Sequence, residues 1–149
     1  LKNKNFPWVL RAAGAKPYAV FAIAGGGSLA AEAERLGLAD LPNVLYLGYV
    51  SDGAAKALMA HCKAFLFPTL YEGFGIPPLE AAACGAPQII VSDTPCMREV
   101  YGPCAAYIDL TANPGDVDDV TPAMAPTAAL LEKYSWDKSA ERLLQILEK

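Results

Sequence analysis

The sequence has 149 residues, of which 54% are hydrophobic and 19% are charged. This length suits one ordinary domain with its own core, and the composition excludes a disordered chain. The net charge is −4, with acidic and basic residues interspersed. Because a nucleic-acid-binding face would need clustered Lys and Arg, we expect no nucleic-acid partner.

No apolar run approaches the roughly 20 residues that span a bilayer. The chain opens without an initiator Met or a signal peptide, so we interpret it as a segment that begins inside a longer protein. The cysteines Cys62, Cys84, Cys96 and Cys104 form no CxxC pair, and with His61 they make a poor zinc set. We expect reduced, buried thiols in a cytoplasmic protein, no bound metal, and His61 on the surface.

In chain order, strand-length apolar runs alternate with helix-length segments. The pattern predicts helices over residues 5–14, 28–36, 52–60, 77–84 and 136–148, and strands over residues 18–24, 44–47, 64–67, 88–91 and 106–108. Ser28, Ser51 and Ser135 suit N-cap positions, and Gly14 and Gly85 suit helix ends. Residues 111–126, which contain three prolines and three aspartates, predict a loop broken by a short helix.

These alternating elements predict one architecture. The strands are apolar on both faces, which is typical of a parallel sheet covered by helices on both sides. We therefore predict an α/β domain with a doubly wound, Rossmann-like parallel sheet over residues 1–149. In such sheets, ligands bind at the carboxyl ends of the strands.

Two of the predicted strand ends carry glycines. The first, Gly25 to Gly27, lacks the G-x-G-x-x-G spacing of a dinucleotide site and is not followed by the Lys-Ser/Thr of a P-loop. A tight turn before a helix explains these glycines equally well. Gly25 to Gly27 could therefore either contact a ligand or form a purely structural turn.

The second glycine-rich segment, E-G-F-G-I-P-P-L-E over residues 72–80, is more specific. Gly73 and Gly75 allow the backbone to approach a ligand closely. Free N–H groups around Gly75 and Ile76, with the positive end of the helix dipole, suit a diphosphate. A carboxylate nearby can accept hydrogen bonds from sugar hydroxyls. The alternative is that both glutamates are structural, one capping the helix and the other lying in the turn.

This string resembles the E-x7-E motif of glycosyltransferase family 4, the group 1 transferases, commonly E-G-F-G-x-P-x-L-E-A. Further segments resemble family landmarks in family order: residues 2–5, 22–27, 43–52, 92–100 and 134–136. The resemblance implies the C-terminal, nucleotide-sugar-binding half of a retaining GT-B glycosyltransferase. It also implies that the first strand of this half and the N-terminal acceptor domain lie outside the chain.

The resemblance assigns roles to individual positions. Lys4 matches the lysine that contacts the donor diphosphate, and Glu72 matches the catalytic glutamate at the donor sugar. Glu80 matches the glutamate that binds the ribose, and Val50 lies in the segment that holds the base. Backbone N–H groups at the sugar and phosphate are implied for Gly73, Phe74, Gly75 and Ile76.

Other side chains near this segment have less specific interpretations. Glu99 also matches a family position, but we favour a helix-capping role for it. We expect Arg98 to be a solvated surface residue. The rings of Tyr71 and Phe74 suit either stacking on a sugar or base, or packing of the loop.

The implied reaction transfers a hexosyl group from a UDP- or GDP-hexose to an acceptor hydroxyl with retention of the anomeric configuration. It needs no metal or other cofactor. The acceptor would be a sugar or a lipid-linked sugar held by the N-terminal domain, which would make any peripheral membrane contact. One alternative is a non-catalytic nucleotide-sugar-binding domain. A second is a dinucleotide-binding oxidoreductase domain, which would need a G-x-G-x-x-G turn and an acidic residue about 20 positions later.

Overall fold

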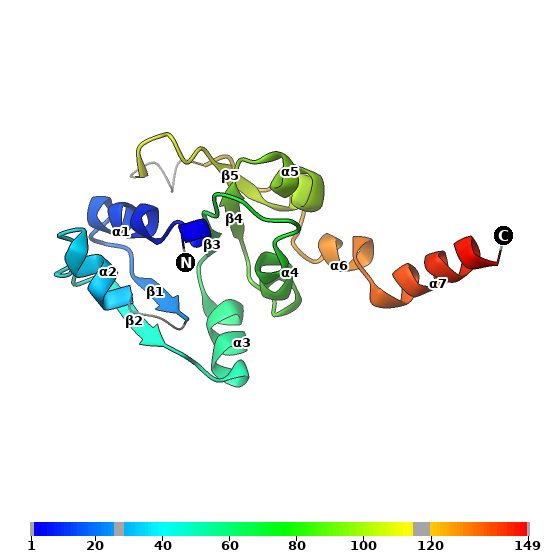
Figure 1. Cartoon of the computed structure of the whole chain (residues 1–149), viewed down its shortest axis with the longest axis horizontal. Coiled ribbons are helices and arrows are strands. Elements are labelled where there is room, and N and C mark those ends of the chain that lie inside the picture. The colour runs from blue at the N-terminus through cyan, green and yellow to red at the C-terminus, as the bar shows by residue number, and fades with distance from the viewer. Residues whose placement is uncertain (1, 26–28, 115–119, 149) are drawn as a thin grey trace.

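A computed structural model of the chain describes residues 2–25, 29–114 and 120–148 (Figure 1). Its strands are β1 (Phe21–Ala24), β2 (Val44–Gly48), β3 (Phe65–Phe67), β4 (Ile89–Ser92) and β5 (Ala106–Ile108). Its α-helices are α1 (Phe6–Ala15), α2 (Leu29–Arg35), α3 (Asp52–His61), α4 (Ile76–Ala83), α5 (Pro95–Tyr101), α6 (Ala129–Lys133) and α7 (Trp136–Leu147). Two short 3-10 helices are η1 (Lys2–Lys4) and η2 (Gly102–Cys104).

The strands are parallel, as predicted, but they form two sheets. β1 pairs with β2, with Phe21 opposite Val44, while the second sheet has the order β3-β4-β5, with Phe65 opposite Ile89. Among the described residues, no strand pairing joins β1 or β2 to β3, β4 or β5, so the expected single sheet is divided in two. The α/β class with parallel strands is therefore confirmed, and the continuity of the sheet is not.

Helix α1 packs against both sheets. Its residues Phe6, Leu10 and Ala13 share a buried cluster with β1, β2 and α2. Its residues Trp8 and Ala12, on another side of the helix, pack on the β3-β4-β5 sheet and also contact β1. The alternation of these positions along one helix lets α1 join the two sheets into one core.

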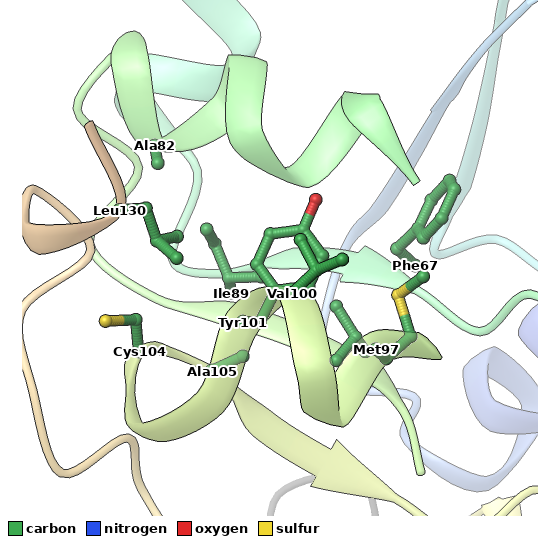
Figure 2. Packing of buried hydrophobic residues seen from close by; sticks show 10 residues of the cluster. Phe67, Ala82, Ile89, Met97, Val100, Tyr101, Cys104, Ala105 and Leu130 are labelled. Carbon is green, nitrogen blue, oxygen red and sulfur yellow. The ribbon is translucent and has the colours of Figure 1, made fainter. Parts of the chain in front are cut away.

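The other face of the β3-β4-β5 sheet carries the largest buried cluster. Side chains from β3, β4, α4, α5 and α6 meet there, and Figure 2 shows them packed between the helices and the strands. The β3-β4-β5 sheet thus has α1 on one face and α4 and α5 on the other, as expected for a doubly wound arrangement.

Several element boundaries differ from the predictions. β1 begins at Phe21 and not at residue 18, and Tyr18 and Val20 before it are exposed. Gly14 does not end α1, because the helix continues to Ala15. Helices α5 and α6 were not predicted, since both are short and lie among prolines and turn residues.

Two predicted caps are confirmed: Ser51 accepts a hydrogen bond from the Ala54 N–H, and Ser135 accepts one from the Lys138 N–H. Ser28 lies outside the described residues. The segment 111–126 also includes residues 115–119 that lie outside them.

Helix α7 extends away from the rest of the domain (Figure 1). Its apolar side chains Leu143, Leu144 and Leu147 are exposed, and no residue of the helix is buried. In the described ranges, no helix is both long and apolar enough to cross a bilayer.

Gly75 provides a test of this packing. Its φ is 81°, and a Cβ built there would lie 2.6 Å from Cε of Met97 on α5. We expect Gly75→Ala to lower the free energy of unfolding by about 1–3 kcal/mol, because it adds backbone strain and a clash. Denaturant unfolding of the chain measures this change.

Gly73→Ala is the matched control, because Gly73 lies in the same loop and a Cβ there would meet no atom within 4 Å. We expect it to change stability by less than about 0.5 kcal/mol. Equal effects of the two substitutions would contradict the tight packing of Gly75 on Met97.

Candidate functional site

The segment with the two glutamates lies at the carboxyl end of β3. Glu72 and Gly73 to Gly75 form the loop between β3 and α4, and Ile76 is the first residue of α4. Gly75 is the N-cap residue in the left-handed conformation. The predicted placement of this loop at the end of a parallel strand is confirmed, and such strand ends are where α/β sheets bind ligands.

The structure brings Lys4 and Glu72 together, although they are 68 positions apart in the sequence. Lys4 Nζ lies 2.6 Å from Glu72 Oε1, and it also lies 4.7 Å from the centre of the Phe67 ring. The lysine side chain is 48% exposed and the glutamate 19% exposed. A cation and a carboxylate therefore meet at a surface that a ligand can reach.

This meeting depends on the contact between η1 and the chain after β3. The backbone oxygen of Asn3 accepts a hydrogen bond from the Leu70 N–H at 2.8 Å. The hydroxyl of Thr69 lies 3.0 Å from the same oxygen and 2.9 Å from Glu72 Oε1. Thr69 was not among the site residues predicted from the sequence. The sequence feature that could have indicated it is its hydroxyl group three positions before Glu72, which is close enough to contact that carboxylate.

Tyr101 of α5 holds the loop through a hydrogen bond to its backbone. The buried Tyr101 hydroxyl donates a hydrogen bond to the Gly75 carbonyl, and Figure 2 shows this hydroxyl pointing from α5 toward α4. Burial raises the pKa of Tyr101, and the nearby Leu79 N–H offsets this only in part. The phenol thus stays protonated at neutral pH and remains a donor.

Few backbone donors remain free in the first turn of α4. Pro77 and Pro78, at the second and third positions of this helix, have no N–H group. The N–H of Ile76 has no hydrogen-bond partner among the residues that the structure describes. With the helix dipole, this leaves a donor that suits an anion.

Glu80 and Val50 lie apart from the Lys4–Glu72 contact. Glu80 is the fifth residue of α4, so it lies just after the first turn of the helix. Its side chain is exposed and makes no ion pair or hydrogen bond to the described residues. Val50 is half-buried between β2 and α3, at the carboxyl end of β2. Both remain predictions as ligand contacts.

The aromatic residues of the loop differ in their surroundings. The Phe74 ring packs edge-to-face on Tyr134, with the ring centres 5.1 Å apart. This contact favours the packing interpretation for the ring, while the backbone N–H of Phe74 stays a predicted donor. Tyr71 is largely exposed.

Residues on α5 lie beside the loop. Glu99 is the fifth residue of α5, so the expected capping role is wrong, and the cap is Thr94, which accepts the Met97 N–H. Burial raises the pKa of the Cys96 thiol, and the charges of Glu99 and Glu72 add to this shift.

Arg98, which was expected on the surface, is exposed and pairs with Asp93 at 2.7 Å. This pair lowers the pKa of Asp93. His61 is exposed at the end of α3, as predicted.

The cysteines are less buried than expected. Cys104 is buried, whereas Cys62, Cys84 and Cys96 are half-buried. Gly25 donates its N–H to the Gly48 carbonyl at 2.8 Å, and Gly26 and Gly27 lie outside the described residues. In the part of the chain that the structure describes, no cluster of three or more His, Cys, Asp or Glu side chains could hold a metal ion.

Comparison with known proteins identifies the class. The model of the family "Glycosyl transferases group 1" matches residues 1–149. The chain therefore belongs to the group 1 glycosyl transferases, and the resemblance to the C-terminal domain of a GT-B glycosyltransferase is confirmed.

Similar proteins are known in sequence and in structure. "O-antigen chain mannosyltransferase B" of Escherichia coli is 38% identical over 97 residues, which are 65% of this chain and 23% of that protein. "GDP-mannose-dependent alpha-(1-6)-phosphatidylinositol dimannoside mannosyltransferase" of Mycobacterium tuberculosis is 40% identical over 88 residues, which are 56% of this chain and 22% of that protein.

The solved structure of AviGT4, a glycosyltransferase involved in avilamycin A biosynthesis, shares the fold. The two structures superpose with a TM-score of 0.68 at 17% sequence identity. The match covers 97% of this chain and 47% of the AviGT4 chain. The chain thus spans under a quarter of the two relatives and about half of this structure.

Removing the Tyr101 hydroxyl tests the support of the loop. Tyr101→Phe leaves the buried Gly75 carbonyl without its donor, so we expect the free energy of unfolding to fall by about 1–3 kcal/mol. Tyr49→Phe is the control, because Tyr49 is 87% exposed, and it should have no measurable effect. Denaturant unfolding of both variants checks this, and an unchanged midpoint for Tyr101→Phe would contradict the anchoring role.

Proposed function

We propose that this chain is the donor-binding half of a transferase that moves a hexosyl group from a nucleoside diphosphate to an acceptor hydroxyl with retention of configuration. The observation that carries the proposal is the 2.6 Å contact between Lys4 and Glu72, beside the first turn of α4. It joins a cation suited to a diphosphate with a carboxylate suited to a sugar.

The proposed roles combine charge and donor type with the roles that the family resemblance implies. The bond between the anomeric carbon and the phosphate oxygen breaks, and its electron pair leaves with the nucleoside diphosphate. The acceptor oxygen bonds to the same carbon and gives its proton to the departing diphosphate. Lys4 and the N–H groups of Gly75 and Ile76 stabilise the charge on the leaving diphosphate. Glu72 holds the sugar, Glu80 the ribose, and the segment around Val50 the base.

The names of the relatives suggest a donor. Both are called mannosyltransferases, and one is called GDP-mannose-dependent. We therefore propose mannose as the sugar and guanine as the base, with a UDP-hexose as the second candidate. Titrating this chain with GDP, UDP and ADP tests the base: GDP should bind most tightly. Absence of binding by all three would contradict a donor site here.

The acceptor site is proposed to lie outside this chain, so that the chain alone binds nucleotide and transfers nothing. A non-catalytic nucleotide-sugar-binding domain would share this behaviour. Sugar release from labelled donor by the full-length parent protein distinguishes the two, because a binding domain releases none. Transfer to an acceptor by the 149-residue chain alone would contradict the half-enzyme proposal.

The two glutamates should affect different measurements in the full-length enzyme. Glu80→Gln removes a charge-assisted hydrogen bond to the ribose, so nucleotide affinity should fall roughly 10- to 100-fold. Glu72→Gln should lower kcat by roughly 10- to 100-fold and leave nucleotide affinity nearly unchanged, because its contact strengthens in the transition state. Calorimetric titration and steady-state kinetics measure the two effects.

Glu34→Gln is a matched control for both variants, because Glu34 is an exposed glutamate of α2. It should change neither affinity nor turnover. A Glu72→Gln variant with weakened nucleotide binding and intact turnover would reverse the assignment. If neither glutamate mattered, both would be structural residues and the proposed site would be wrong.

A further inference from the structure

Thr69 is a buried residue, 1% exposed, at the point where η1 meets the chain after β3. Its hydroxyl oxygen lies 2.9 Å from Glu72 Oε1, 3.0 Å from the Asn3 carbonyl and 3.2 Å from the Tyr71 carbonyl. All three atoms are acceptors, and the hydroxyl has one proton to donate. The Asn3 carbonyl already accepts the Leu70 N–H, and the carboxylate is charged. Glu72 is therefore the strongest acceptor for the Thr69 proton.

The two oxygens of the Glu72 carboxylate have different surroundings. Oε1 is contacted by both Lys4 Nζ, at 2.6 Å, and Thr69 Oγ1, at 2.9 Å. Oε2 makes no hydrogen bond or ion pair with the residues that the structure describes. A carboxylate held through one oxygen keeps the lone pairs of the other for a ligand hydroxyl.

Lys4 and Thr69 differ in how firmly they hold Oε1. Lys4 ends a flexible four-carbon side chain that is 48% exposed, and an exposed ion pair contributes little stability. Thr69 is buried and β-branched, so its χ1 angle is restricted. A bound diphosphate would give Lys4 a second anionic partner, whereas the Thr69 hydroxyl would keep its contact with Glu72.

We propose that Thr69 is a positioning residue, which fixes Glu72 through Oε1 while Lys4 binds the donor diphosphate and so keeps Oε2 directed at the sugar. This inference rests on the proposed function above. Thr69 acts through Glu72 and does not itself contact the donor. Loss of its hydroxyl therefore lowers turnover and leaves nucleotide affinity nearly unchanged.

The test uses four variants of the full-length parent enzyme: Thr69→Val, Thr69→Ser, Glu72→Gln and the double variant Thr69→Val/Glu72→Gln. Val keeps the branched shape without the hydroxyl, and Ser keeps the hydroxyl. We expect Thr69→Val to lower kcat about 10- to 100-fold with the donor KM within about 2-fold, and Thr69→Ser to stay within about 3-fold of the parent. Because Thr69 acts through Glu72, the double variant should be less than about 2-fold slower than Glu72→Gln alone.

The outcomes separate this inference from the proposed function. Normal turnover in Thr69→Val, with a slow Glu72→Gln, would overturn the positioning role and leave the proposed function standing. Normal turnover in Glu72→Gln would overturn both. Equal losses from Thr69→Val in the parent and in the Glu72→Gln background would show a structural role independent of Glu72, and would also overturn the inference. If the Val variant does not fold, Thr69→Ala carries the same expectations.

Discussion

The hydrogen bond from the Leu70 N–H to the Asn3 carbonyl is the contact on which the candidate site depends. It ties η1 to the chain just after β3, and so places Lys4 beside Glu72. The Lys4–Glu72 ion pair itself does little to fix this geometry, because a solvent-exposed ion pair contributes only about 0–1 kcal/mol to stability. The buried Thr69 hydroxyl also lies 3.0 Å from the Asn3 carbonyl, and leaving a buried polar group unpaired costs about 1–3 kcal/mol. The backbone therefore fixes the geometry, and the charges are left available for a ligand.

The rest of the core supports this contact from two sides. α1 follows η1 directly and packs on both sheets, which anchors the segment that carries Lys4. On the other face, Met97 and Tyr101 of α5 hold Gly75, so the loop with Glu72 is also fixed. When packing and hydrogen bonds from neighbouring residues hold the ligand-contacting side chains in place, the geometry of the site is more precise than on a free loop.

Asn43 shows how a residue in a family-like segment can serve the fold. It opens the stretch 43–52, which resembles a family landmark, yet its side chain is buried. The Asn43 amide nitrogen lies within 2.8–2.9 Å of the carbonyls of Ala13, Lys16 and Ala19, which share its two hydrogens. It thereby pairs carbonyls at the end of α1 and in the turn before β1. Its chemistry is that of a buried amide that stabilises the chain around it.

The sequence by itself determined the features that depend on neighbouring residues. Alternating apolar runs indicated the parallel α/β class, Ser51 and Ser135 marked helix starts, and the spacing of Glu72 and Glu80 located the loop at the end of β3. Only the tertiary structure decided that Asn3 meets Thr69, that Tyr101 supports Gly75, and that the strands divide into two sheets. Helix periods and caps depend on residues a few positions apart, whereas these contacts join residues up to 66 positions apart. Such pairs are selected by how helices pack on strands, which no local pattern specifies.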